Sequence, residues 1–230
     1  MKIKLVLLFI ALFSLNVIAQ ESDNETLPSK YIYLDGSVQV GTDFIGSLAY
    51  GHSWGLGQKK KFVIGTGLRF SVFQGYSNQS KDFFSAPPEY YGKEEKQDTL
   101  SIVSPNQMNI ALYISLSYRI KSKFEVGMNI DAVGYTFGRD QNAFYTGNGS
   151  TQATTAISNG PSLLLVAAND YGMLSSEFYV QYHINTKWSA RLGFAHTFTE
   201  YSTPTELQPG NKRFRGVSDG VMIGARYNLK

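Results

Sequence analysis

The sequence contains no cysteine. This absence excludes a disulfide framework, a lipid anchor attached through cysteine and a structural zinc site with cysteine ligands. The fold must therefore be held together by packing, hydrogen bonds and ion pairs.

Apolar runs of the length of a spanning helix are also missing. The run from Leu5 to Ile18 is shorter than the roughly 20 residues that such a helix needs. It follows two lysines and ends at the small-residue site before Gln20, which is the pattern of a cleaved secretory signal peptide. After Ala19 no run approaches this length, so a membrane would have to be crossed by strands.

These boundaries divide the chain into three expected parts. We expect residues 1–19 to be the signal peptide, 20–29 a polar leader without fixed structure, and 30–230 one exported domain. Without the signal lysines, 19 basic residues stand against 18 acidic ones. This near-neutral balance gives no support for nucleic-acid binding.

What the sequence does contain is strands with two different faces. From Met108 to Ile120, MNIALYISLSYRI, apolar and mostly polar residues alternate with a period of two. This period is typical of a strand, and its uninterrupted apolar face requires either a second sheet or lipid as a partner. Similar strands are expected at Tyr31–Val40, Phe44–Trp54, Phe62–Val72, Phe124–Phe137, Met173–Ile184, Trp188–Phe198 and around Gly220–Leu229.

The connections between these eight expected strands differ in length. Three are tight, at Gly55–Lys61, Lys121–Lys123 and Asn185–Lys187. Three are longer and are expected to be loops, at Gln74–Gln107, Gly138–Asp170 and Thr199–Gly216. Short turns at one end and mostly long loops at the other, with the tight turn Gly41–Asp43 as the exception, favour an all-β, eight-stranded antiparallel up-and-down transmembrane β-barrel.

Two patterns favour lipid over a second sheet. Outward-facing aromatic residues collect beside the tight turns and predict an interfacial girdle of Trp54, Phe62, Tyr118, Phe124, Tyr182, Trp188 and Tyr227. Inward-facing charges cancel and predict an interior charge network of Asp35, Arg69, Arg119, Glu125, Asp131, Glu177, Arg191 and Arg226. A soluble lipocalin-type barrel, the alternative, would be apolar inside and polar outside.

With these patterns the chain resembles the OmpA/OmpX-like eight-stranded outer-membrane barrels, including the porin-like and PorT-like β-barrel proteins. The resemblance covers about Tyr31 to Lys230, and its most specific segment is the final strand, Gly224 to Leu229. That strand is similar to the C-terminal assembly signal of such barrels, although Leu229 replaces the terminal aromatic residue and Lys230 follows it. The resemblance implies insertion in the outer membrane of a Gram-negative bacterium, with outer-membrane lipid and lipopolysaccharide as partners.

Function is less clearly indicated. We expect a closed barrel that holds extracellular loops for binding or envelope organisation. The alternatives are a narrow porin-like transport channel and a subunit of an outer-membrane secretion or assembly complex. No cofactor or metal site is expected, and neither is catalysis, because the three histidines lie on different strands and none has a suitable serine beside it in sequence.

The long connections hold the candidate contacts with a protein partner or with lipopolysaccharide. Exposed aromatic residues are expected at Phe83, Phe84, Tyr90 and Tyr91, where apolar groups on a loop would mark a contact surface. Arg213 and Arg215 are expected in a solvated loop, where they would pair with lipopolysaccharide phosphates. The competing interpretations are that the aromatics pack on one another and that the arginines are only solvated.

Overall fold

The computed structural model describes residues 29–90, 97–147, 149–165, 169–204 and 210–229, so the predicted signal peptide and nearly all of the leader lie outside the described residues. The elements are β1 (Lys30–Gly41), β2 (Phe44–Leu56), β3 (Phe62–Gln74), β4 (Ser80–Ser85), the 3-10 helix η1 (Pro88–Tyr90), β5 (Thr99–Val103), β6 (Asn106–Lys121), β7 (Phe124–Phe137), β8 (Gln141–Gly147), β9 (Ser150–Ser158), β10 (Pro161–Leu163), β11 (Leu174–His183), β12 (Trp188–Ser202) and β13 (Arg213–Asn228). No helix among these elements has the length and apolar character needed to cross a membrane.

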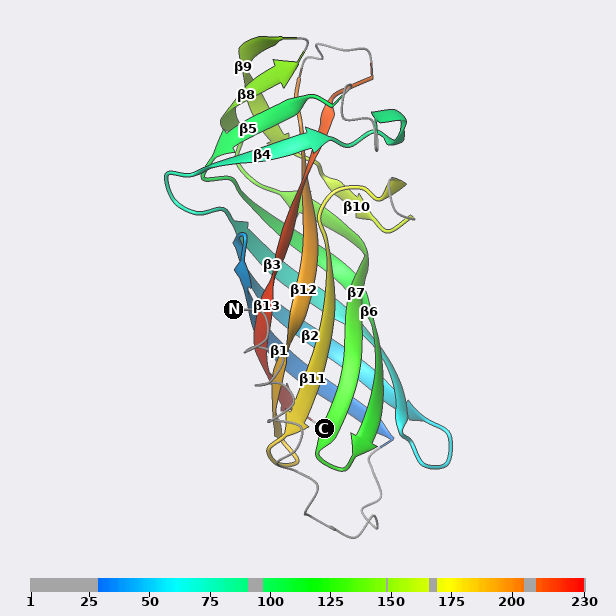
Figure 1. The fold of residues 1–230 in the computed structure, drawn as a ribbon. Coiled ribbons are helices and arrows are strands. Elements are labelled where there is room, and N and C mark those ends of the chain that lie inside the picture. The colour runs from blue at the N-terminus through cyan, green and yellow to red at the C-terminus, as the bar shows by residue number, and fades with distance from the viewer. Residues whose placement is uncertain (1–28, 91–96, 148, 166–168, 205–209, 230) are drawn as a thin grey trace, which may run out of the picture.

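The long strands pair in a ring, which we call the main ring (Figure 1). Starting at β1, antiparallel pairing leads through β2, β3, β6, β7, β11, β12 and β13, and β13 pairs again with β1. The predicted all-β antiparallel architecture is confirmed. The predicted total of eight strands is wrong, because the described residues form thirteen.

The additional strands come from the connections that the sequence analysis assigned to loops. Gln74–Gln107 contains β4 and β5, and Gly138–Asp170 contains β8, β9 and β10. β4, β5, β8 and β9 pair in series between the ends of β13 and β12, and with those two ends they form a second ring, the cap ring (Figure 1). The long connections are thus folded structure.

The third connection was also assigned wrongly. Thr199–Gly216 was expected to be a loop, but β12 continues to Ser202 and β13 begins at Arg213. The two strands stay paired up to Ser202 and Arg213. This extension gives the cap ring its link to the main ring.

Alternation along the main-ring strands separates two environments. On β6, Met108, Ile110, Leu112, Ile114, Leu116, Tyr118 and Ile120 are exposed on the outer face. The intervening side chains are buried, among them Asn109, Tyr113 and Arg119. The outside of the ring is therefore apolar and the inside polar, which is the reverse of a water-soluble barrel.

A β-bulge changes this alternation on β7. Leu112 pairs with Val133 and Tyr113 with Asp131, so Ala132 is the extra residue. Beyond the bulge Val133 and Tyr135 are exposed. The predicted alternation, which placed Ala132 on the regular outer face, fails at this point because one inserted residue reverses the faces.

The interior of the cap ring is apolar. Its core includes Phe83, Leu100, Ile102, Ala143, Tyr145, Ala156, Tyr201 and Phe214, together with Ile45, Phe73 and Met173. The Phe83 and Tyr201 ring centroids lie 5.0 Å apart in an edge-on arrangement, and those of Tyr145 and Phe214 lie 5.3 Å apart. The cap ring thus has the packing of a domain that folds in water, above a ring with the opposite arrangement.

Candidate functional site

The interior of the main ring contains a connected set of ion pairs. Arg69 contacts Asp131 at 2.9 Å and Glu177 at 2.6 Å. Glu177 also lies 3.5 Å from Arg191, whose guanidinium pairs in turn with Asp35. Arg226 contacts the other oxygen of Asp35 at 2.9 Å. Six of the eight predicted interior charges therefore form one chain of contacts through the lumen.

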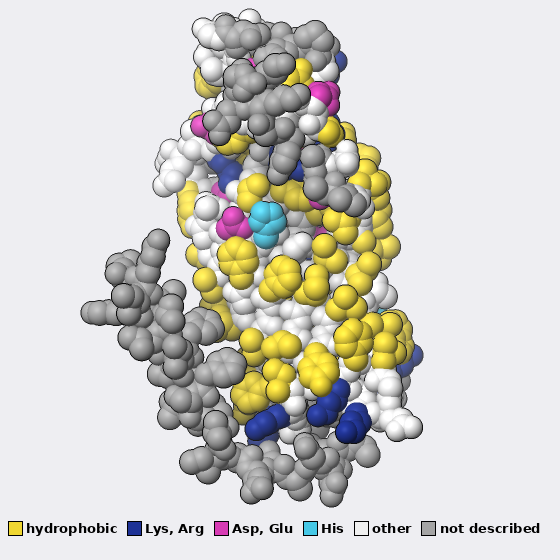
Figure 2. All heavy atoms as spheres, turned by 45° about the vertical axis from the view of Figure 1, so that its right-hand side comes forward, with side chains coloured by type: hydrophobic (Ala, Val, Ile, Leu, Met, Phe, Trp, Pro, Cys, Tyr) yellow, Lys and Arg dark blue, Asp and Glu magenta, His cyan; other side chains and the backbone are white. Residues whose placement is uncertain are grey.

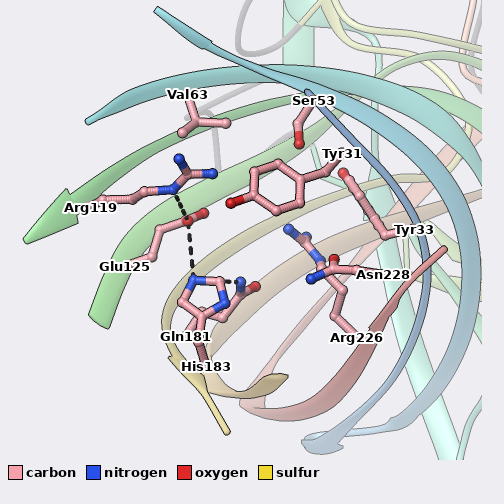
Figure 3. Close-up of a pocket in the computed structure, with 10 residues that line it drawn as sticks. All are labelled: Tyr31, Tyr33, Ser53, Val63, Arg119, Glu125, Gln181, His183, Arg226 and Asn228. Atoms are coloured by element: carbon pink, nitrogen blue, oxygen red, sulfur yellow. Dashed lines mark hydrogen bonds and ion pairs between the residues drawn. The ribbon is translucent and has the colours of Figure 1, made fainter. Parts of the chain in front are cut away.

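The other two charges, Arg119 and Glu125, form a separate pair nearer the short turns. Arg119 Nε lies 3.3 Å from Glu125 Oε2, and His183 Nε2 lies 3.5 Å from the same oxygen (Figure 3). This contact was not predicted from the sequence, where the three histidines were noted only as lying on different strands. The contact follows from the register of β7 and β11. Gln181 lies opposite Glu125, and His183 is two residues further along the same face of β11.

Each luminal arginine faces a tyrosine ring. The guanidinium carbons of Arg226 and Arg191 lie 3.9 and 4.8 Å from the ring centroids of Tyr33 and Tyr179. Arg69 and Arg119 face Tyr113 and Tyr31 in the same way, at 5.2 and 4.7 Å. Each luminal arginine thus combines a carboxylate with an aromatic face, an arrangement that stabilises a desolvated cation.

A small residue makes room for these rings. A β-carbon at Gly51 would lie 2.3 Å from the hydroxyl of Tyr113 and 2.5 Å from the ring of Tyr33. Those two hydroxyls are 3.0 Å apart and hydrogen-bonded across the lumen. The absence of a side chain at Gly51 therefore allows two large side chains to meet.

The space left in the lumen is small. The cavity in Figure 3, between Tyr31, Arg119, Glu125 and Arg226, has a volume of about 10 Å³, and a second cavity beside Arg69, Glu177 and Arg191 is equally small. Each has room for about one water molecule. Side chains therefore fill these parts of the lumen.

The predicted girdle residues lie at one end of the main ring. Phe62 pairs with Tyr118, Phe124 with Tyr182, and Trp188 with Tyr227 across neighbouring strands. Trp54 lies two residues before Leu56, on the same face of β2, and Leu56 is the residue that pairs with Phe62. Five of the seven are exposed and the other two, Phe124 and Tyr227, half-buried. Figure 2 shows hydrophobic side chains over a broad band of one face, with basic side chains below it.

The candidate loop contacts are placed differently from the prediction. Phe83 is fully buried in the core of the cap ring and Tyr90 is also buried, so neither is an exposed contact. Phe84, the next residue on β4, is 47% exposed. Tyr91 lies outside the described residues. Alternation within β4 explains the difference, since neighbouring residues of a strand face opposite sides.

Arg213 and Arg215 are strand residues and not part of a solvated loop. Both contact the fully buried Glu200, at 3.0 and 2.7 Å. Glu200 also accepts hydrogen bonds from Asn159 Nδ2 and the backbone N–H of Gly172, each at 3.0 Å. Glu200 and Arg213 thus hold Asn159, Asp170 and Gly172 against β12 and β13, and the interpretation as a merely solvated run is wrong.

A second buried carboxylate lies in the cap ring. Asp98 accepts hydrogen bonds from the hydroxyl of Tyr145 and, at 2.6 Å, from Asn211 Nδ2. Burial, and then the neighbouring carboxylate, raise the pKa of the Tyr145 phenol above its usual range. The phenol therefore keeps its proton and remains a donor at ordinary pH.

The described residues contain few other side chains suited to catalysis or metal binding. No cluster of three or more histidine, aspartate or glutamate side chains suited to a metal ion occurs in the described part of the chain. His52 Nε2 lies 3.0 Å from the hydroxyl of Tyr50 on the outer face. His196 Nδ1 lies 2.7 Å from Asp219 Oδ1, also on the outer face.

Comparison with known proteins gives structural neighbours only. No family model matches the sequence, and no curated protein matches it. Neisserial surface protein A is similar to 88% of this chain over 98% of its own length, with 10% identity and a TM-score of 0.37. The attachment invasion locus protein Ail of Yersinia pestis has 8% identity and a TM-score of 0.38, covering 88% of this chain and 100% of Ail. A major outer membrane protein of Thermus thermophilus has 11% identity and a TM-score of 0.40, with the same coverages. These neighbours are outer-membrane β-barrel proteins, and the likeness is too distant to assign this chain to one family or one activity.

Proposed function

We propose that this chain is an integral outer-membrane β-barrel protein with a plugged lumen, which holds its cap ring outside the cell for binding or envelope organisation. The observation that carries the proposal is the distribution of polarity in the main ring. Its outer face exposes apolar side chains on every strand, and its interior holds four arginines paired with four carboxylates. Lipid is the solvent that such an outer face requires.

The two ends of the ring support an orientation. The short connections carry six lysines, Lys59, Lys60, Lys61, Lys121, Lys123 and Lys187, next to the aromatic girdle. The opposite end carries the cap ring. Short turns on the periplasmic side and folded extensions outside would match the usual arrangement of these barrels. Outer-membrane lipid and lipopolysaccharide would surround the ring, and the exposed Phe84 and Phe144 of the cap offer a surface for a protein partner.

Placing a charge in the lipid-facing band tests the location. Leu112 lies on β6 within the band and is 50% exposed. We expect Leu112→Arg to destabilise the protein in lipid vesicles by about 2–4 kcal/mol, because the guanidinium must be moved into hydrocarbon. The measurement is urea unfolding by tryptophan fluorescence. Ala153→Arg, on the outer face of the cap ring, is the control and should have an effect near zero; equal effects at both positions would contradict a membrane location.

Planar-bilayer recording tests the plugged lumen against the transport channel. The ion-paired side chains and the cavities of about 10 Å³ leave no continuous path for a hydrated ion in this part of the lumen. We therefore expect no stable conductance after insertion of the purified protein, with insertion verified by recovering labelled protein from the bilayer. Reproducible single-channel steps would favour the channel instead.

A further inference from the structure

A polar row crosses the apolar outer face of the main ring on three neighbouring strands. In the β11–β12 pairing Ser176 lies opposite His196, and in the β12–β13 pairing His196 lies opposite Asp219. All three point outward, since their strand neighbours Ser175, Thr197 and Ser218 are buried inside. The next outward residues toward the girdle are Phe178, Phe194 and Val221, each about half exposed.

The two members of the row on β12 and β13 are already hydrogen-bonded. His196 Nδ1 lies 2.7 Å from Asp219 Oδ1, and both side chains are about half exposed. The backbone of Asp219 is held by Thr42, whose hydroxyl and N–H each form a hydrogen bond of 3.1 Å with it. A carboxylate on Nδ1 fixes the imidazole tautomer in which Nε2 is the free base.

With Ser176 the row holds a nucleophile next to a base, His196, and the base next to an orienting acid, Asp219. Directly opposite residues of an antiparallel pair have β-carbons roughly 4.5–5.5 Å apart, so rotamer changes can bring the serine hydroxyl to His196. Such contacts often tighten only when substrate binds. Ser176 comes from the neighbouring strand and is not adjacent to a histidine in sequence, so the sequence alone did not indicate it.

The surroundings of the row indicate the kind of molecule that would reach it. Toward the girdle the outer face is apolar, as acyl chains require. In the other direction the next outward positions are Phe198 and Val217, and beyond them lie the fully buried Glu200 and its partners Arg213 and Arg215. The row thus lies near the cap end of the apolar face, a short distance from two arginines, at a depth where an amphiphilic lipid would have its ester bonds. Figure 2 shows a histidine beside an acidic side chain, with hydrophobic side chains around them.

We propose that Ser176, His196 and Asp219 form a serine hydrolase site on the outer face of the ring, acting on carboxylic esters of membrane lipids. Ser176 Oγ attacks the ester carbonyl carbon while His196 Nε2 takes the hydroxyl proton. The carbon–oxygen bond to the alcohol breaks, and the alcohol leaves with that proton. Water, deprotonated by Nε2, then cleaves the acyl–serine ester, so that ester and water yield fatty acid and alcohol. Asp219 is a positioning residue for His196.

The lipid substrate depends on the proposed membrane location, but the site itself can be tested without it. We would treat the full-length protein in detergent micelles with a fluorophosphonate probe and with p-nitrophenyl butyrate, and locate the adduct by peptide mass spectrometry. Labelling at Ser176 with ester hydrolysis is expected. Ser176→Ala should abolish both, and His196→Ala should slow both more than about a hundredfold. His52→Ala, which alters a histidine hydrogen-bonded to a tyrosine on the same outer face, should have no effect.

Asp219 needs a readout that a purely structural role would not change. Asp219→Asn should lower kcat with little change in KM and shift the lower pH limit of hydrolysis, and Asp219→Glu should restore part of the rate. Absence of labelling at Ser176 in the folded wild-type protein, or equal activity in Ser176→Ala, would overturn the proposal. Labelling in micelles by a protein that fails to insert into phosphatidylglycerol–phosphatidylethanolamine vesicles would overturn the membrane location and leave the site standing. Fatty-acid release from inserted protein would support both.

Discussion

Replacing Glu177 by glutamine is expected to destabilise the folded protein by about 3–5 kcal/mol. Glu177 is buried, and its two oxygens contact Arg69 at 2.6 Å and Arg191 at 3.5 Å. Glutamine has nearly the same shape but no charge, so two buried guanidinium groups lose a shared partner. The measurement is reversible urea unfolding in lipid vesicles.

Two further variants separate this effect from a general loss of charge. Lys59→Gln also removes one charge, but at an exposed turn, and should change stability by less than about 0.5 kcal/mol. Adding Arg69→Met to Glu177→Gln should recover part of the loss, because it restores the balance of positive and negative charges in the lumen, although Asp131 then loses its arginine. A loss below about 1 kcal/mol for Glu177→Gln alone would contradict the connected network.

Phe83→Ala is expected to unfold the cap ring while the main ring stays intact. Phe83 is completely buried against Tyr201, and removing a buried phenyl ring costs about 3–5 kcal/mol through lost burial and the remaining cavity. The cap ring depends on a small core, so this loss should expose β4, β5, β8 and β9 to protease. Limited proteolysis with mass mapping measures it.

The adjacent residue is the matched control. Phe84 differs from Phe83 only in facing outward, where it is 47% exposed. Phe84→Ala should leave the cleavage pattern unchanged. Equal proteolysis of both variants would contradict the apolar core of the cap ring, and cleavage within the main-ring strands would contradict its independence from the cap.

Alternation was sufficient to predict the eight main-ring strands over most of their length and the inward position of the eight luminal charges. On β6 the apolar residues keep one parity for the whole membrane-length segment, so the face of Arg119 follows from its position in sequence. Alternation shows which face of a strand a residue lies on, but not which residue lies opposite it on the next strand. The partner of each charged side chain could therefore not be predicted. The contact of His183 with Glu125 and the row through His196 depend on register in the same way.

The cap strands were missed for a different physical reason. β9, STQATTAIS, has almost no apolar alternation, because only one of its residues is buried. β4, SKDFFS, contains adjacent phenylalanines, so its two faces look alike in sequence although one faces the core. The charged Arg213 and Arg215 suggested a loop because their partner Glu200 is buried on another strand, and such pairing leaves no periodic signal.

The sharing of β12 and β13 by both rings has a consequence for the order of assembly. β13 spans residues close to the C-terminal end and pairs with β12, with β1 at the other end of the sequence, and with β4. Neither ring can be completed before this last hairpin has been made, and pairings of such long sequence separation form slowly. The outer edges of β4 and β9, which pair with β13 and β12, must therefore stay unpaired until the β12–β13 hairpin forms and joins the two rings.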